Sequence, residues 1–276
     1  MNKIYATLLA TVISSSLWAS AALAAQTTPV DLKEGGKSYK GTLVYPDHAK
    51  GSLPLVLVVH EWWGKTEYPE MRARKIADEL GYAALAVDLF GEGKTGTTPP
   101  EATELAGPFY KDPMIGVKLL QQFAAAAPTA AKKAGFSIDS AKIAAIGYCF
   151  GGSQVLNLAR AGGLTGKEKL LGVVSFHGAL ESSLKAKSPI KPQILVLTGA
   201  ADPMVDAKKV EEFKEEMKKD KAQFDVISYP GAKHAFTNQK ATELGNKYKM
   251  PIAYNAEADA DSWQKMKTFL SKIFSK

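Results

Sequence analysis

Cys149 is the only cysteine among the 276 residues of the chain, and it lies in the segment Gly-Tyr-Cys-Phe-Gly at 147–151. This segment joins an apolar run to a helical pattern, which is the strand–turn–helix setting of a nucleophile elbow. A helix N-terminus there would favour a thiolate, and the amide of Phe150 would be one oxyanion donor. Taken alone, the motif also fits a small inert core side chain, because free cysteine is commonly buried.

Two further residues stand where the partners of such a nucleophile are expected. Asp202 follows the apolar run 194–197 and His234 follows the run 226–229, so each is predicted in a loop past a strand end. Asp202 could instead cap a helix, and His234 could only hydrogen-bond its own loop. The order nucleophile, acid and histidine is that of the α/β-hydrolases. It predicts that Cys149 attacks a carbonyl carbon, supported by His234 and Asp202.

The elements that must position these residues alternate along the chain. Continuous apolar runs such as 55–59 predict strands buried on both faces of a parallel sheet, and apolar residues at helical spacing predict helices. The predicted strands are 38–45, 55–59, 82–87, 142–148, 171–176, 193–197 and 224–229, and the predicted helices are 69–80, 113–126, 152–160, 206–219 and 257–274. We therefore expect one α/β domain with a mostly parallel, doubly wound sheet flanked by helices.

The N-terminal segment 1–24 predicts a cleavable secretory signal. Lys3 precedes an apolar stretch that ends in Ala22-Leu-Ala24, whose small residues suit a signal peptidase. A membrane span is the alternative, but Thr11 and several serines dilute the run and no basic stop-transfer cluster follows. We expect the mature domain to comprise 25–276, to be exported, in a bacterium to the periplasm, and to keep no stable membrane span.

Composition and spacing disfavour several other functions. The net charge of +7 comes mainly from scattered lysines that are often paired with glutamates, which is typical of solvated helix faces and not of a nucleic-acid surface. A single cysteine leaves no intramolecular disulfide and no CxxC or cysteine-based zinc motif. His48 and His60 lack metal-ligand spacing. Neither a metal nor an organic cofactor is expected, and the sequence does not indicate an oligomeric state.

The chain resembles the dienelactone hydrolase family from about Asp31 to Phe274, which implies the α/β-hydrolase fold. The matching segments are 59–64 (Val-His-Glu-Trp-Trp-Gly), 87–90 (Val-Asp-Leu-Phe), the elbow at Cys149, Asp202-Pro203 and 231–236 (Gly-Ala-Lys-His-Ala-Phe). The resemblance implies a Cys-His-Asp triad and a glutamate, here Glu61, that contacts the resting thiol and changes partners when substrate arrives. It also implies that the amide of Trp62 is the second oxyanion donor.

Several residues are candidates for the pocket wall, namely Trp63, Phe90, His177 and Asn238, although His177 fits a structural role equally well. Family members that cleave dienelactone hold its carboxylate with arginines, and one of these positions is Asn238 here. The other falls near Glu92, where only Lys94 could supply a cation, so dienelactone itself is doubtful as substrate. The Gly-, Pro- and Thr-rich stretch 91–112 fits a partial lid and a long connection equally.

These features lead to one principal hypothesis and two rivals. The principal one is hydrolysis of a small-molecule ester or lactone through an acyl-thioester on Cys149. The first rival is an exported small-molecule binding protein that has kept the fold and lost turnover. The second is a thiol redox protein, although the chain holds no resolving cysteine to complete an ordinary cycle.

Overall fold

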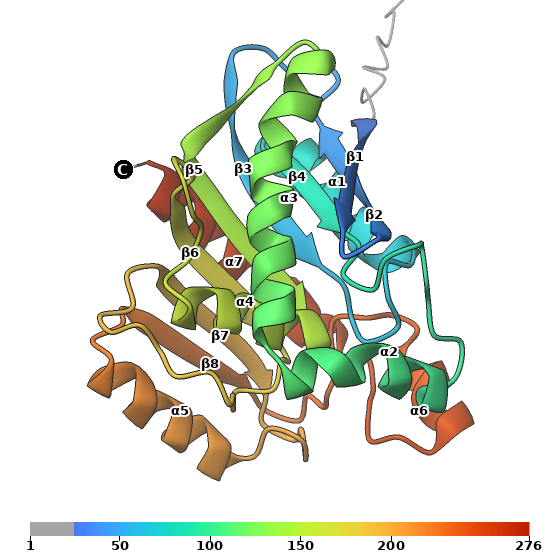
Figure 1. Ribbon diagram of the computed structural model, residues 1–276. Coiled ribbons are helices and arrows are strands. Elements are labelled where there is room, and N and C mark those ends of the chain that lie inside the picture. The colour runs from blue at the N-terminus through green and yellow to red at the C-terminus, as the bar shows by residue number, and fades with distance from the viewer. Residues whose placement is uncertain (1–24, 276) are drawn as a thin grey trace, which may run out of the picture.

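The computed structural model describes residues 25–275, which form one eight-stranded sheet in the order β1-β2-β4-β3-β5-β6-β7-β8 (Figure 1). The strands are β1 (Gln26–Glu34), β2 (Lys37–Tyr45), β3 (Ser52–Val59), β4 (Ala83–Val87), β5 (Ser137–Tyr148), β6 (Leu170–Phe176), β7 (Gln193–Gly199) and β8 (Phe224–Tyr229). All neighbours from β4 to β8 pair in parallel, whereas β1 and β2 are antiparallel. The predicted mostly parallel sheet is confirmed. The predicted signal segment, 1–24, lies outside the described residues.

Helices cover both faces of the sheet, as the predicted doubly wound architecture requires. They are α1 (Glu67–Leu80), α2 (Pro99–Lys111), α3 (Met114–Lys133), α4 (Phe150–Arg160), α5 (Ala207–Lys219), α6 (Ala241–Tyr248) and α7 (Ala256–Phe274). Figure 1 shows α3 and α4 in front of the sheet, with α1 and α7 behind it. Among the described residues, none of these helices combines the length and apolarity needed to cross a bilayer.

The core explains why the central strands are continuously apolar. Along β3, Leu55, Leu57 and Val59 join the cluster under α3 and α4, whereas Val56 and Val58 join the cluster under α1 and α7. Successive side chains of a strand point to opposite faces, so a strand covered on both faces must be apolar at every position. This layering places the carboxyl ends of β3, β5, β7 and β8 along one edge, where the predicted catalytic residues follow them.

Buried Arg160 ties the end of α4 to α5. Its Nε and Nη2 atoms donate to the two carboxylate oxygens of Glu216, each at 2.7 Å, and Nη2 also donates to the carbonyl of Leu180. The arginine is 1% exposed, whereas the Glu216 side chain is 33% exposed, so water can partly replace a lost partner of the carboxylate. Removing the Arg160 side chain would still lose its packing and its hydrogen bond to the Leu180 carbonyl, and both losses would destabilise the fold.

We expect Arg160→Ala to lower the free energy of unfolding by about 2–3 kcal/mol, near the low end for a broken buried pair. Urea denaturation followed by circular dichroism measures this. A matched control is Lys208→Ala, which removes a lysine that is 83% exposed and lies 3.6 Å from Glu212. The control should not shift the midpoint measurably, and equal midpoints for the two variants would contradict the role given to Arg160.

Candidate active site

Cys149 lies at a sharp turn between β5 and α4. Its backbone adopts φ 54° and ψ −115°, a strained conformation for a residue with a side chain. A side-chain carbon at Gly147 would lie 2.1 Å from the carbonyl oxygen of Gly151, and one at Gly151 would lie 2.5 Å from that of Val59. The turn can close against β3 only because both flanking positions are glycine. The predicted elbow is thus present, with Cys149 directly before the first turn of α4.

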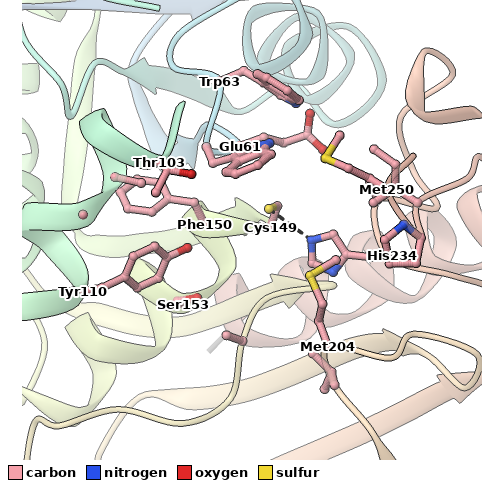
Figure 2. A pocket seen from close by; sticks show the side chains of 18 residues that line it. Glu61, Trp63, Thr103, Tyr110, Cys149, Phe150, Ser153, Met204, His234 and Met250 are labelled. Atoms are coloured by element: carbon pink, nitrogen blue, oxygen red, sulfur yellow. Dashed lines mark hydrogen bonds between the residues drawn. The ribbon is translucent and has the colours of Figure 1, made fainter. Parts of the chain in front are cut away.

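The three residues predicted to act together are connected by hydrogen bonds. His234 Nε2 lies 3.1 Å from Cys149 Sγ, and His234 Nδ1 lies 2.8 Å from Asp202 Oδ2. The second carboxylate oxygen of Asp202 accepts the amide of Met204 at 2.8 Å, which fixes the rotation of the carboxylate. Figure 2 shows the thiol and the imidazole facing each other across the cavity floor. The arrangement can move a proton from sulfur to the imidazole.

The surroundings of His234 favour its charged form. Burial alone would lower the pKa of His234, but the Cys149 thiolate and the hydrogen bond that His234 donates to Asp202 outweigh burial and raise the pKa to about 10. At neutral pH the imidazole therefore keeps its proton whenever Cys149 is ionised. The proton is then available for a leaving group later in the reaction.

Two backbone amides beside Cys149 are free to bind an oxyanion. Within residues 25–275, neither the amide of Phe150 nor that of Trp62 has a hydrogen-bond acceptor. The Glu61 carbonyl accepts from His60 Nδ1 at 2.6 Å and from the amide of Gly64 at 3.1 Å. Because the C=O and N–H of a trans peptide point in opposite directions, the Trp62 amide must point away from both donors. The predicted oxyanion roles remain predictions, and the free amides are compatible with them.

His60 is neutral, and its hydrogen bonds fix the loop that follows β3. Its Nε2 accepts the amide of Leu89 at 3.2 Å, so the proton lies on Nδ1, which donates to the Glu61 carbonyl. Burial lowers the pKa of His60 to about 4. The imidazole thus links the loop after β3 to the loop after β4 without contacting the cavity.

Glu61 does not hold the thiol in this structure. Its Oε2 accepts from Asn238 Nδ2 at 2.6 Å, while the Cys149 sulfur is paired with His234. The expected contact between Glu61 and a resting thiol is therefore not the one that the structure shows, because the Asn238 amide engages the carboxylate. Asn238 itself is not among the cavity-lining residues, so its prediction as a pocket residue is wrong. It is buried behind Glu61.

Glu61 is expected to destabilise the folded protein above neutral pH. Burial raises its pKa to about 7, against the opposing hydrogen bond from Asn238 and the charges of His234 and Arg72. The unfolded carboxyl ionises near its ordinary pKa, about 4.3, so the native state binds more protons between that value and about 7. Stability attributable to this group therefore falls as pH rises through that window.

Glu61→Gln removes this titration while keeping an acceptor for Asn238. We expect the variant to unfold at the same urea concentration as the wild type at pH 4, and to be more stable at pH 8 by on the order of 3–4 kcal/mol. Urea titrations of both proteins at the two pH values give the comparison. A difference between variant and wild type that does not depend on pH would contradict the assignment.

A buried hydrogen-bond chain supports the elbow from below. The amide of Cys149 donates to the carbonyl of Phe176 at 2.9 Å and to His177 Nδ1 at 3.1 Å. His177 Nε2 therefore carries the proton and donates to Thr237 Oγ1 at 2.8 Å, and Thr237 in turn pairs with the hydroxyl of Tyr68 at 2.6 Å. His177 does not line the cavity, so of its two predicted roles the structure shows the structural one. Burial, followed by the charges of His234 and Arg72, lowers its pKa, which keeps the ring neutral.

The cavity above Cys149 has a volume of about 350 Å³ and is mostly apolar. It is lined by Glu61, Trp62, Trp63, Thr103, Ala106, Gly107, Tyr110, Cys149, Phe150, Ser153, Ala179, Met204, Val205, His234, Ala235, Met250, Pro251 and Ile252. Trp63, a candidate for the pocket wall, is among these residues. Phe90 is not one, because its ring is buried between His60 and Phe150, at centroid distances of 4.7 and 5.4 Å.

The stretch 91–112 is neither a loose lid nor a plain connection, because its second half is helix α2. Four residues of α2 line the cavity, namely Thr103, Ala106, Gly107 and Tyr110. No lysine or arginine is among the lining residues, and Lys94 instead pairs with Glu92 at 2.9 Å, half exposed to solvent. Nor do any three His, Cys, Asp or Glu side chains of residues 25–275 converge in a way that could hold a metal ion.

Sequence reasoning missed several wall residues, including Ser153, Met204 and Met250. Ser153 had a detectable signal, because residues four apart share one face of a helix and it follows Cys149 by four. Met204 and Met250 carried none, since they enter the cavity from loops whose course depends on the whole fold. Together with the other lining residues, they enclose the mostly apolar cavity around Cys149 and His234.

Comparison with known proteins adds independent findings. The sequence pattern of the dienelactone hydrolase family matches residues 39–274. A Saccharolobus solfataricus protein provisionally named carboxymethylenebutenolidase is 28% identical over 266 residues, covering 86% of this chain and 95% of its own. A dienelactone hydrolase-like promiscuous phosphotriesterase from metagenomic libraries is 31% identical, with a TM-score of 0.77 over 91% of this chain and 99% of its own. An α/β-hydrolase from a Medee basin metagenome shares the fold, with a TM-score of 0.62 over 92% and 100% of the two chains at 15% identity.

Proposed function

This chain belongs to the dienelactone hydrolase family and is therefore a hydrolase of esters or lactones, and from that premise we propose that Cys149 is its nucleophile. The observation that carries the proposal is His234, placed between the thiol at 3.1 Å and the Asp202 carboxylate at 2.8 Å. A base held between a nucleophile and an orienting acid is the arrangement that acyl transfer requires.

In the acylation step, the Cys149 thiol gives its proton to His234 Nε2, and the sulfur forms a bond to the substrate carbonyl carbon. The carbonyl electron pair moves to oxygen, and the free amides of Phe150 and Trp62 stabilise that oxyanion. The intermediate then collapses, the carbon–oxygen bond of the ester breaks, and the departing oxygen takes the proton from His234. The product of this half-reaction is an acyl-thioester on Cys149.

In the deacylation step, His234 takes a proton from water, and the water oxygen attacks the thioester carbon. Collapse of the second intermediate releases the acid and returns the Cys149 thiolate beside a protonated His234. If the substrate is a lactone, the alcohol freed in the first step stays on the acyl group, and one hydroxy acid is released. Asp202 holds the imidazole in the orientation that both steps use.

The substrate class that fits the cavity is an uncharged ester or lactone with an apolar body. The walls are mostly apolar, no lysine or arginine lines them, and Glu61 is an acid at the floor. A carboxylate on the substrate would lose its hydration without gaining a lysine or arginine partner, and it would lie in the same cavity as the Glu61 carboxyl. A dicarboxylate-like lactone is therefore disfavoured here.

A panel of activated esters and small lactones tests this function. The purified protein should hydrolyse p-nitrophenyl butyrate and neutral lactones faster than matched compounds that carry a carboxylate. Rapid acid quenching followed by mass spectrometry should detect the acyl group on the Cys149 peptide. Faster turnover of the carboxylate compounds would overturn the substrate class, and the absence of any adduct during turnover would count against the covalent route.

Uncharged phosphotriesters are a second substrate class, supported by the same mostly apolar cavity, which no lysine or arginine lines. One structural relative, at 31% identity, is a promiscuous phosphotriesterase. A triester carries no net charge, so its phosphoryl oxygen could take the place of the ester carbonyl before the amides of Phe150 and Trp62. An aryl dialkyl phosphate added to the ester panel tests this, and a rate no higher than that without enzyme would remove the second class.

Export with cleavage after Ala24 is also part of the proposal. The supporting observation is that the backbone nitrogen of Ala25 lies 3.1 Å from Asp78 Oδ1. After cleavage this nitrogen would be an α-ammonium group and would form an ion pair with that carboxylate. Intact mass of protein from a periplasmic fraction should correspond to 25–276. An Ala22→Arg variant should keep the longer mass, since a large charged residue blocks the small-residue cleavage site.

A further inference from the structure

Ser153 carries a buried hydroxyl that the catalytic scheme does not use. It lies one helical turn after Cys149 on α4, is 5% exposed, and lines the cavity. Its Oγ atom has no hydrogen-bond partner among the described residues. Burying a hydroxyl without a hydrogen-bond partner costs free energy. A polar group that enters the cavity could supply the missing partner of Ser153.

Tyr110 offers a second hydroxyl on the same wall. It projects from α2, is half exposed, and its ring packs edge-on against Phe150 at a centroid distance of 5.9 Å. Its hydroxyl makes no hydrogen bond within residues 25–275. Partial burial, followed by the charges of Cys149 and Glu181, raises the pKa of Tyr110, so the phenol stays protonated and can donate. Thr103, the other hydroxyl among the lining residues, is already committed to the carbonyl of Pro99 at 2.8 Å.

The position of Ser153 and Tyr110 relative to Cys149 determines which part of a bound substrate they contact. Figure 2 shows Tyr110 and Ser153 on one side of Cys149 and His234 on the other. The departing oxygen must lie near His234, because it receives the proton from that side. The acyl group then extends from the thioester carbon away from His234, toward Tyr110 and Ser153.

We propose that Ser153 and Tyr110 form an acyl-side subsite that binds an uncharged oxygen of the substrate, so that the enzyme prefers oxygen-bearing acyl groups over purely hydrocarbon ones. The inference rests on the proposed function and specifies its substrate. Both groups are neutral hydroxyls, so they suit an ether, hydroxyl or ketone oxygen. A carboxylate would instead need a lysine or arginine partner, and no lysine or arginine lines the cavity.

The experiment uses acyl groups of equal length that differ by one atom. The substrates are p-nitrophenyl pentanoate and its two oxa analogues, the ethoxyacetate and the 3-methoxypropanoate. For each enzyme, kcat/KM for an oxa analogue is divided by that for the pentanoate. Comparing this ratio between wild type and variants cancels the intrinsic reactivity of the esters.

Ser153→Ala removes the hydroxyl with little change in volume, and Tyr110→Phe keeps the ring contact with Phe150. Each variant should lower the ratio for at least one oxa analogue about five-fold, the value of one neutral hydrogen bond, while the pentanoate is still hydrolysed. Thr103→Val is the matched control, because its hydroxyl is already bonded within α2. Its ratio should equal that of the wild type.

The outcomes separate the subsite from the proposed function. Hydrolysis of all three esters with ratios unchanged in both variants would overturn the subsite and leave the hydrolase proposal standing. No hydrolysis of any ester by the wild type would overturn the proposed function itself. Because Ser153→Ala and Tyr110→Phe test the same subsite separately, failure of one variant to fold still leaves a decisive measurement on the other.

Discussion

Cys149→Ala is expected to lower kcat for p-nitrophenyl butyrate by at least about three orders of magnitude, because no other group can form the covalent intermediate. The cysteine is the only one in the chain, and its sulfur is the atom that faces His234 Nε2. Residual hydrolysis would come from the amides of Phe150 and Trp62 and from binding alone. Release of p-nitrophenolate, followed at 25 °C over a range of substrate concentrations, measures the loss.

The single cysteine also provides an independent chemical control. Iodoacetamide can label only one thiol in the wild type, so activity should fall in proportion to the labelled fraction measured by mass spectrometry. A neutral ester that acylates Cys149 should slow this labelling. Thermal unfolding of Cys149→Ala should match the wild type closely, since the substitution keeps a side-chain carbon at the strained turn. Undiminished turnover in the variant would refute Cys149 as the nucleophile.

The sequence predicted the buried central strands and the amphipathic helices, and it missed strand β1 and helices α2 and α6. The central strands appeared as continuous apolar runs because helices cover both of their faces. Strand β1 escaped prediction because it is an edge strand in which only Val30 is buried and Pro29 interrupts the pattern. Helix α2 lies in the stretch 91–112, for which the sequence predicts a partial lid or a long connection, because prolines begin the helix, although proline is well suited to a first helical turn.

The proximity of Cys149, Asp202 and His234 could be predicted because each of them follows a strand end, and parallel strands bring their carboxyl ends to one edge. The partners of Glu61 and His177 could not be predicted in this way. Glu61 bonds to Asn238 across 177 positions, and His177 bonds to Thr237 across 60. Such contacts depend on the exact packing of loops, for which a single sequence carries no periodic signal.

The loop after β8 organises the site more than any single motif suggested. His234 forms a hydrogen bond with the Cys149 thiol, and Asn238 donates one to Glu61. Thr237 accepts a hydrogen bond from His177, the histidine beneath the elbow. Buried Arg72 donates to the carbonyl of Thr237 and to Asp259 of α7, which fixes the loop against the rear helices. His234 and the hydrogen-bond partners of His177 and Glu61 therefore lie in one short segment, so the positions of these three groups are set together.

Asp202→Asn should lower kcat by about three to four orders of magnitude, because it forces the wrong tautomer on His234. The Met204 amide donates to Oδ1 of Asp202 and can be satisfied only by an acceptor. The carboxamide must therefore turn its oxygen to Met204 and its NH2 group to His234 Nδ1. His234 would then accept at Nδ1 and carry its proton on Nε2, facing the thiol, where it cannot act as base.

The pH dependence separates this explanation from simple misfolding. Hydroxide in solution can remove the thiol proton without help from His234, so the deficit of Asp202→Asn should narrow steadily in alkaline buffer. Asp206→Asn is the matched control on the same loop: Asp206 caps α5 through the amide of Lys209 at 2.9 Å, and asparagine caps equally well. It should keep wild-type activity at every pH. A deficit of Asp202→Asn that stays constant with pH would mean that Asp202 maintains the fold of the loop and does not set the tautomer of His234.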